Sequence, residues 1–335
     1  MKAALRNFVD TLGKEIDARR NFLGESPIET IYFGGGTPSL LDPESFCDIA
    51  DLMKREFNLE EVEEFTIEVN PDDVCASGGE DKLAAWRSCG VNRVSMGVQS
   101  FVDSHLRWMN RRHSASQAEE AFRILRSQGF DNLSIDLIFG FEALSDSDWE
   151  FNIGKAVELA PEHISCYQLS IDPESALAVD FEAGRYRELS QEKCAAQYEL
   201  LCDALAAAGY EHYEISNFAR EGRFSRHNSS YWSREPYLGL GPGAHSFDGD
   251  RFRCWNGPLP QWLRGEFAIE GEHLTDNDVF NERVMLSLRT ARGTDSELIQ
   301  GAVRGLEPAP DGRWRIPENS WFISDAIISG FMRMV

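Results

Sequence analysis

The residues that most clearly indicate chemistry form the run Gly34-Gly35-Gly36-Thr37-Pro38-Ser39. This run follows a strand-like segment at 29–33 and precedes a helix-like segment. Three glycines remove side chains from a strand-to-helix turn, so that backbone N–H groups can approach a ligand closely. Glycine-rich turns bind phosphates, carboxylates or nothing in many folds. The loop alone therefore does not identify a ligand, and the other residues of the site must be considered with it.

Polar side chains occur at or near the ends of all the strand-like segments in the first half of the chain. They are Thr37, Glu68, Asn70, Gln99, Asp136 and Gln168. In parallel α/β barrels the site forms at the C-terminal ends of the strands, so these groups should converge on one mouth.

The strands that must position these side chains alternate with helices. Strand-like segments lie at 31–33, 65–69, 93–98, 133–139 and 164–169, and helical patterns lie at 44–57, 81–89, 116–128 and 148–159. This alternation predicts parallel strands joined by right-handed crossovers. A barrel-like and a doubly wound sheet both fit, and the polar strand ends favour the barrel. Before the first strand, apolar residues from Leu5 to Ile16 recur at the spacing of an amphipathic helix.

The alternation ends at about Tyr210, where an aromatic stretch rich in glycine and histidine begins. We interpret 221–265 as ordered connecting loops over the site, following a partial barrel at 1–220. Helical patterns at 278–288 and 324–332 flank a turn-rich segment at 308–317. They predict a small, mainly helical and winged-helix-like domain at 266–335.

Composition excludes several classes of function. The chain has 33 basic and 56 acidic residues, a net charge of −23, which disfavours broad binding to nucleic acid or anionic lipid. No run of about 20 apolar residues suggests a membrane span, so we expect no transmembrane segment and a cytoplasmic protein. The seven cysteines form no C-x-x-C pair and no close cluster.

Several runs together resemble the radical S-adenosylmethionine (SAM) family of oxygen-independent coproporphyrinogen III oxidase-like proteins. After the glycine loop these runs lie at 68–72, 93–101, 110–113 and 134–140, in the family's order. Within that family the chain is most similar to the HemW branch of heme chaperones. This similarity rests on His227-Asn228-x-x-Tyr231-Trp232 and on the runs at 241–246, 285–290 and 324–328. The resemblance implies an α/β fold, an incomplete (β/α)6 TIM-like partial barrel that lacks its first strand.

The resemblance also implies SAM contacts at particular positions, and the chemistry of each side chain agrees. Backbone groups of Gly35, Gly36 and Thr37 would meet the amino-acid end of the cofactor. Side chains of Glu68, Gln99 and Asp136 would hydrogen-bond its ammonium or hydroxyl groups. The Arg111 fork would clamp its carboxylate. Taken singly, Arg111 also fits a surface arginine and Asp136 a helix-capping carboxylate.

For heme the resemblance implies three further residues. His227 would ligate the iron, while Tyr231 and Trp232 pack on the porphyrin. The competing hypothesis is that His227 and Asn228 fix a loop by hydrogen bonds and the aromatic residues fill the core. We interpret His245 as structural and His113 as a loop residue.

The chain departs from the family at the iron–sulfur motif. Relatives carry C-x-x-x-C-x-x-C, three thiolates that bind a [4Fe–4S] cluster, ahead of the glycine loop. Here the first cysteine is Cys47, already past that loop, and the spacings to Cys75 and Cys89 are too wide. We therefore expect no cluster ligands, no metal site for the cluster, no catalytic residues and no reductive cleavage of SAM by this polypeptide.

Two explanations compete for the missing motif. Either Met1 is an internal methionine of a longer gene product, or the chain is a shortened paralogue that retains only binding. Loss of a barrel strand would expose the edge of the strand at 31–33, a cost that favours truncation. The appended domain is also expected to lack a helix, because only about thirty residues separate Gly293 from Ser324.

The leading functional hypothesis is a HemW-like protein that binds heme and passes it to acceptor proteins. The alternative is a coproporphyrinogen III oxidase, which decarboxylates porphyrin propionates oxidatively in porphyrin biosynthesis. A third is a scaffold that has lost both activities. The cofactors implied are SAM, heme and, in longer relatives, [4Fe–4S]; the partners are heme or porphyrin and heme-acceptor proteins, with a homodimer left open.

Overall fold

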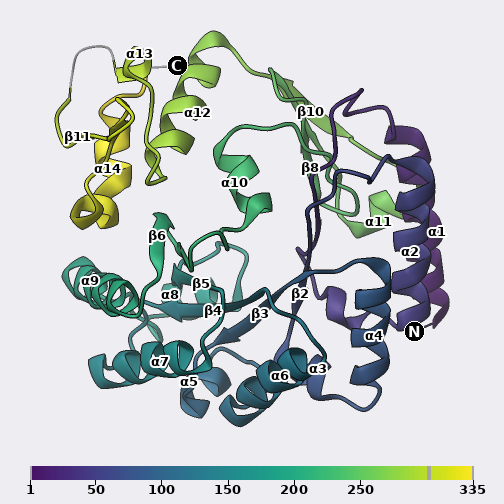
Figure 1. Ribbon diagram of the computed structural model, residues 1–335, viewed down its shortest axis with the longest axis horizontal. Coiled ribbons are helices and arrows are strands. Elements are labelled where there is room, and N and C mark those ends of the chain that lie inside the picture. The colour runs from purple at the N-terminus through teal and green to yellow at the C-terminus, as the bar shows by residue number, and fades with distance from the viewer. Residues whose placement is uncertain (1, 300–302, 334–335) are drawn as a thin grey trace.

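A curled seven-stranded sheet forms the centre of the molecule (Figure 1). The structure, a computed structural model, describes residues 2–299 and 303–333. The sheet order is β1-β2-β3-β4-β5-β7-β6. Its parallel part comprises β1 (Thr30–Phe33), β2 (Glu64–Val69), β3 (Arg93–Gln99), β4 (Leu133–Phe139) and β5 (His163–Gln168). The predicted α/β partial barrel and its strands are confirmed.

The far end of the sheet turns back on itself. Strand β7 (Asn217–Ala219) pairs antiparallel with β5, and β6 (Glu211–Glu214) pairs antiparallel with β7. Within the described residues β1 pairs only with β2 and so forms the other edge.

Helices cover the outer face of the sheet (Figure 1). The helices of this part of the chain are α1 (Lys2–Arg19), α2 (Pro43–Glu56), α3 (Pro71–Cys75), α4 (Gly79–Cys89), α5 (Asp103–Trp108), α6 (Ala115–Ser127), α7 (Asp146–Leu159), α8 (Ala176–Glu182) and α9 (Gln191–Ala207). Local sequence explains where several begin. Asp42 caps α2 ahead of Pro43, and Ser114 with Gln117 forms a capping box at α6.

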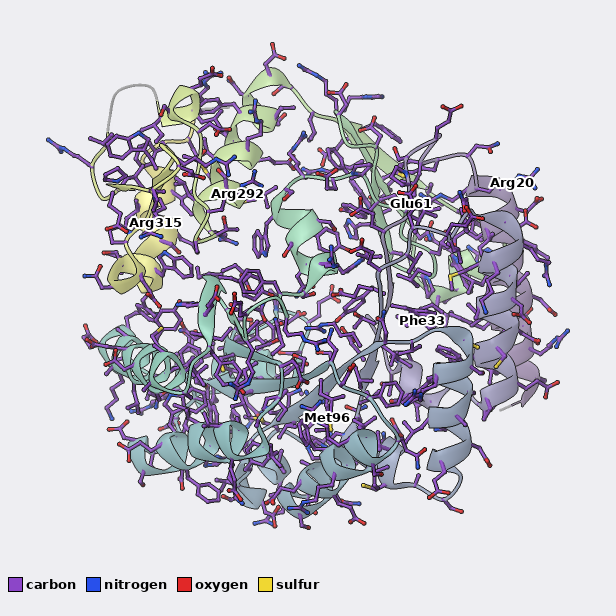
Figure 2. All side chains as sticks on the ribbon, viewed as in Figure 1. Arg20, Phe33, Glu61, Met96, Arg292 and Arg315 are labelled. Atoms are coloured by element: carbon purple, nitrogen blue, oxygen red, sulfur yellow. The ribbon has the colours of Figure 1, made fainter. Side chains whose placement is uncertain are left out.

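The core lies between these helices and the sheet. Apolar and polar residues alternate along β2 to β4, so that Ile67, Val94, Met96 and Ile135 share the face that packs against the helices. Figure 2 shows Met96 deep among the side chains of the sheet and Arg20 at the outer edge beside α1.

The prediction that 221–265 consists of connecting loops was wrong. This segment contains helix α10 (Arg226–Trp232), strands β8 (His245–Phe247) and β9 (Phe252–Trp255), and helix α11 (Leu259–Trp262). With β10 (Glu270–His273) the two strands form an antiparallel sheet of order β10-β9-β8. Strands of three or four residues are too short to show a clear alternation of apolar and polar positions.

The C-terminal part combines short helices with a small hairpin. It contains α12 (Asp276–Leu288), α13 (Ser296–Ile299), the antiparallel pair β11 (Glu307–Pro308) and β12 (Trp314–Arg315), the 3-10 helix η2 (Glu318–Ile323) and α14 (Ser324–Ser329). Strand β10 pairs with β9 across the expected boundary at 265/266, and the domain limits stay a prediction. No helix among the described residues is long and apolar enough to cross a membrane.

Candidate functional site

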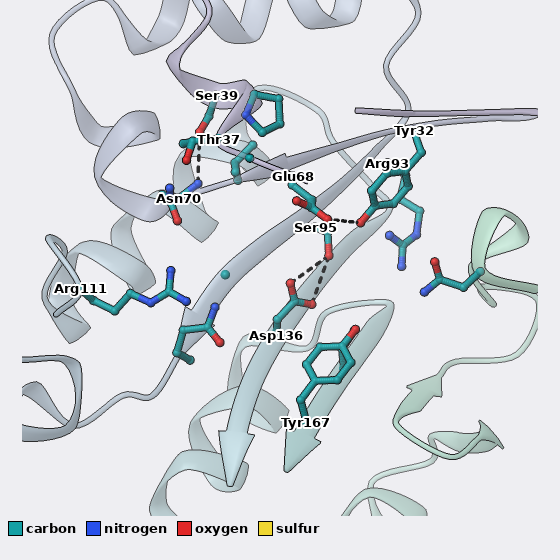
Figure 3. A pocket seen from close by; sticks show the side chains of 17 residues that line it. Tyr32, Thr37, Ser39, Glu68, Asn70, Arg93, Ser95, Arg111, Asp136 and Tyr167 are labelled. Atoms are coloured by element: carbon teal, nitrogen blue, oxygen red, sulfur yellow. Dashed lines mark hydrogen bonds between the residues drawn. The ribbon is translucent and has the colours of Figure 1, made fainter. Parts of the chain in front are cut away.

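A cavity of about 400 Å³ opens at the inner face of the parallel strands (Figure 3). Its walls come from all five parallel strands, the glycine loop and α10. The lining residues are Tyr32, Gly36, Thr37, Pro38, Ser39, Glu68, Val69, Asn70, Arg93, Ser95, Gly97, Gln99, Arg111, Asp136, Ser165, Tyr167 and Asn228. Thus Gly36, Thr37, Glu68, Gln99, Arg111 and Asp136, all of them predicted, line one cavity, and Gly35 lies in the same loop.

The glycine loop is packed against Glu68. The Glu68 carboxylate accepts a hydrogen bond of 2.6 Å from the Tyr32 hydroxyl and one of 3.2 Å from the Gly35 N–H. A Cβ at Gly34 would lie 2.7 Å from Glu68 Oε1, and Gly35 has a φ of +76°, so both positions require glycine. Around Gly35 and Gly36 nothing lies within 4 Å of where a Cβ would be, which leaves their backbone open to a ligand.

The far end of the loop is anchored by Ser39. Its buried hydroxyl donates to Asp73 at 2.7 Å, and the Lys82 ammonium donates to its carbonyl at 2.7 Å. Thr37 stands at the N-cap position of the short 3-10 helix η1 (Pro38–Leu40), where its side chain makes no capping hydrogen bond. The loop is therefore fixed at both ends while its middle faces the cavity.

Asp136 lies on the floor of the cavity, where Ser95 Oγ donates to its carboxylate at 3.1 and 3.2 Å (Figure 3). Burial raises the pKa of Asp136 to about 6, although a hydrogen bond from Ser165 and the charge of Arg93 act in the opposite direction. Because burial destabilises the ionised form of this carboxylate, a ligand that donates hydrogen bonds to it would stabilise that form.

Gln99 and Arg111 also line the cavity. Gln99 has a φ of 66°, which is strained for a residue with a side chain, and follows a shift of register between β3 and β4. The Arg111 guanidinium forms no hydrogen bond or ion pair with any described residue. Burial lowers the pKa of Arg111, while Asp136 and Asp72 raise it. An unpaired, half-buried guanidinium fits a carboxylate from outside the chain.

Three residues for which no role was predicted, Arg93, Tyr32 and Tyr167, also line the cavity, as does Asn228. The Arg93 side chain is 2% exposed, and its Nε has no hydrogen-bond partner among the described residues; the nearest carboxylate oxygen, on Glu64, is 3.9 Å away. A signal was present in the sequence, because a charged residue begins a strand of otherwise buried residues.

Helix α10 carries the His227-Asn228-x-x-Tyr231-Trp232 run and lies on the open side of the sheet (Figure 1). The Glu64 carboxylate accepts from the backbone N–H groups of Arg226 and His227 at 2.9 and 3.0 Å, which attaches the first turn of α10 to β2. Asn228 lines the cavity from the same helix.

His227 is held from three sides. Its ring stacks on Tyr32 at 4.7 Å, Nδ1 lies 2.8 Å from Thr30 Oγ1, and Nε2 lies 3.1 Å from the Tyr231 hydroxyl. Burial lowers the pKa of His227 to about 4, so the imidazole is neutral at pH 7. Iron ligation by His227 would require Nε2 to exchange Tyr231 for the metal, because both ring nitrogens are engaged.

Tyr231 and Trp232 differ in their surroundings. Tyr231 is 39% exposed and makes an edge contact with Tyr237 at 4.8 Å. Trp232 Nε1 is buried and has no partner among the described residues. His245 is exposed and stacks on Trp255, and His113 is buried in the loop between α5 and α6 with Nε2 3.1 Å from the Val98 carbonyl.

The cysteines do not fit an iron–sulfur cluster. All seven are described, all are free, and none lines the cavity. Cys47 and Cys89 lie 3.3 Å apart between α2 and α4, in contact with the hydrophobic core. The described residues therefore fit SAM, through an open glycine backbone and an unpaired guanidinium, and they do not provide the cluster.

The chain is similar to several known proteins. Residues 10–153 match the radical SAM superfamily. The chain is 34% identical over 280 residues to "Heme chaperone HemW" of Bacillus subtilis, which covers 82% of this chain and 73% of that protein. It is also 34% identical to the protein of the same name from Synechocystis, over 85% of this chain and 70% of that one.

Among solved structures the chain is similar to coproporphyrinogen III oxidase (HemN) from Escherichia coli, described as a radical SAM enzyme. The TM-score is 0.82 over 100% of this chain and 85% of that one, with 20% sequence identity. At that identity the likeness shows the shared fold.

Proposed function

The chain belongs to the HemW family of radical SAM proteins, and on that premise we propose that it is a heme chaperone, which binds heme and delivers it to acceptor proteins. The observation that carries this proposal is the identity to relatives named heme chaperones over most of the chain. We expect it to act in the cytoplasm, which its free thiols favour.

We propose SAM as the ligand of the cavity. Arg111 would hold the carboxylate of the cofactor, Glu68 its ammonium, and Asp136 and Gln99 its hydroxyl groups, with the backbone of Gly35, Gly36 and Thr37 along one side. In radical SAM proteins the cofactor supplies a 5′-deoxyadenosyl radical once a reduced cluster cleaves it. The described residues of this chain bind and orient the cofactor only.

For heme we propose the face of α10. The neutral imidazole of His227 is the protonation state that iron requires, and the unpaired Trp232 Nε1 is a donor without an acceptor in the protein. Because Asn228 of the same helix lines the SAM cavity, the proposed heme and SAM sites share one mouth. The rival role of His227, fixing α10 on β1, is supported by its hydrogen bond with Thr30 and its stacking on Tyr32.

Hemin titration followed by absorbance tests the proposal. The expected result is a shifted Soret band that saturates at one equivalent and remains with the protein on gel filtration. Absence of any shift overturns the heme proposal. Calorimetry with SAM is a separate measurement, so loss of one ligand does not obscure the other.

Coproporphyrinogen III oxidase is not carried forward as a second candidate. The likeness to that enzyme is at 20% identity and concerns the fold, whereas the Bacillus subtilis and Synechocystis relatives at 34% identity bear the chaperone name.

A further inference from the structure

Three side chains with metal-binding atoms meet far from the cavity. They are Cys202 on α9, His212 on β6 and Glu318 on η2. Their Sγ, imidazole nitrogen and carboxylate oxygen all lie within 4.8 Å of one another. Among the described residues this is the one group of three His, Cys, Asp or Glu side chains that meets this criterion.

The spacing of the three atoms matches a tetrahedral metal site. His212 Nδ1 lies 3.7 Å from Cys202 Sγ and 3.0 Å from Glu318 Oε1. Around a tetrahedral Zn²⁺ with ordinary bond lengths, a sulfur and a nitrogen ligand are about 3.6 Å apart, and a nitrogen and an oxygen about 3.3 Å apart. Small side-chain movements would therefore convert the cluster into three coordination bonds.

The residues around His212 orient its ring so that Nδ1 faces Cys202 and Glu318. Its ring stacks on Phe218 with a centroid distance of 4.0 Å and meets the edge of Trp321 at 4.2 Å. The other nitrogen, Nε2, lies 3.4 Å from the Ile215 carbonyl. Ligating histidines commonly donate their second N–H to a carbonyl or carboxylate, which orients the ring for the metal.

We propose that Cys202, His212 and Glu318 form a binding site for Zn²⁺ or a similar borderline-soft divalent cation. Thiolate, imidazole and carboxylate are the ligand types that Zn²⁺ takes, and three protein ligands leave a fourth position for water. The His212 side chain is 4% exposed and that of Glu318 is 58% exposed, so the cation enters from solvent on the Glu318 side. Binding replaces the thiol proton of Cys202, which leaves to solvent.

Such a site would connect the barrel with the C-terminal part of the chain. Cys202 and His212 belong to the barrel, whereas Glu318 begins the 3-10 helix that packs on α9. A bound cation would therefore stabilise the attachment of the C-terminal part to the barrel. This inference is independent of heme and SAM binding.

Metal titration of the tag-free, chelator-treated chain tests the site. With Zn²⁺ we expect one equivalent bound and a higher melting temperature, and with Co²⁺ a sulfur-to-cobalt charge-transfer band in the near ultraviolet. Cys202→Ser should abolish that band and weaken Zn²⁺ binding at least tenfold. Glu318→Gln, at an exposed position that should not affect folding, should weaken it at least tenfold as well.

Cys75→Ser is the matched control, because Cys75 is also a half-buried free thiol but lies outside the cluster. It should bind Zn²⁺ and Co²⁺ like the unaltered chain. The proposal is overturned if the unaltered chain binds no Zn²⁺ at micromolar concentration. It is equally overturned if Cys202→Ser and Glu318→Gln bind the metals as the control does, since the metal then sits elsewhere.

Discussion

At the residue scale the cavity is organised by charges that the protein only partly compensates. Asp136 is ionised against the cost of burial, Arg111 has no partner among the described residues, and the Arg93 Nε lacks a hydrogen bond. Such groups destabilise the empty protein, and a ligand that pairs with them stabilises them. We therefore expect ligand affinity and stability of the empty chain to change in opposite directions at this site.

Asp136→Asn tests this opposition. The pKa of Asp136 is raised from 3.8 to about 6, so its contribution to stability is fully present below pH 3.8 and is lost as the pH rises through about 6. The shift corresponds to roughly 3 kcal/mol at neutral pH, before relaxation of the site. Asp136→Asn should therefore raise the free energy of unfolding at pH 7.5 by about 1 to 2 kcal/mol. It should also weaken SAM binding at least tenfold.

Urea unfolding at pH 4.5 and 7.5, with calorimetry for SAM, measures both effects. The gain in stability should be roughly a third as large at pH 4.5, where the folded-state carboxyl is protonated but the unfolded-state carboxyl is mostly ionised. Asp131→Asn is the control, since Asp131 is exposed on a loop and should leave both quantities unchanged. A variant that is less stable at pH 7.5, or that binds SAM normally, would contradict the account of Asp136.

At the element scale the first helix ties distant segments together. Glu15 of α1 is fully buried and accepts hydrogen bonds from the Gly241 N–H at 2.8 Å, Asn256 Nδ2 at 2.6 Å and Trp262 Nε1 at 2.7 Å. Arg19, one turn later, neutralises it at 3.0 Å. One carboxylate thus fixes the 241–246 loop and α11 against the N-terminal helix.

Glu15→Gln should destabilise the chain strongly. The glutamine NH₂ group would face the donors that Glu15 now accepts from, and Arg19 would be left buried without its ion pair. Together these effects should lower the free energy of unfolding by about 3 to 5 kcal/mol. Urea unfolding measures the loss, and hydrogen exchange should show the amides of 239–246 among those that lose protection. Asp17→Asn, on the exposed side of the same helix, should cost less than about 0.5 kcal/mol. A loss below about 1 kcal/mol for Glu15→Gln would show that the network is dispensable.

The elements differ in how far the sequence predicts them. The parallel strands and their helices could be predicted, because short strand-like segments alternate along the chain with segments of 3.6-residue helical periodicity. Polar residues at the ends of the strand-like segments also indicated a shared edge of the sheet. The small sheet β10-β9-β8 could not, because its strands are too short for a periodic signal. The buried role of Glu15 could not either, since its partners lie more than 220 positions away in the sequence.

The candidate site was predictable to a similar extent. Glu68, Gln99 and Asp136 could be predicted because each lies at or near a strand end, whereas Arg111 followed only from the family resemblance; all four line one cavity. Arg93 was missed because it begins its strand and reaches the cavity through the length of its side chain. The contact of His227 with Thr30 depends on the docking of α10 on β1, which no local pattern indicates.

At the scale of the whole molecule, an acidic protein encloses a site with two arginines. The net charge is −23, yet Arg93 and Arg111 both face the cavity. The overall charge repels polyanions, while a small ligand with a carboxylate finds two cations in a partly buried site. Helix α10 lies at the same mouth, so the fold gathers the proposed cofactor and heme residues on its open side (Figure 1).

The most direct test of the account is a hemin titration of three proteins, the unaltered chain, His227→Ala and His245→Ala, followed in the Soret region. His245 is exposed and serves as the matched histidine control. We predict that His245→Ala binds hemin like the unaltered chain, whereas His227→Ala binds at least tenfold more weakly and with its residual Soret band at a different wavelength. If His227→Ala binds hemin more weakly but with an unchanged Soret band, His227 does not ligate the iron and only holds α10 in place. Identical binding by all three proteins, or no binding by any, would contradict the claim that α10 carries the heme.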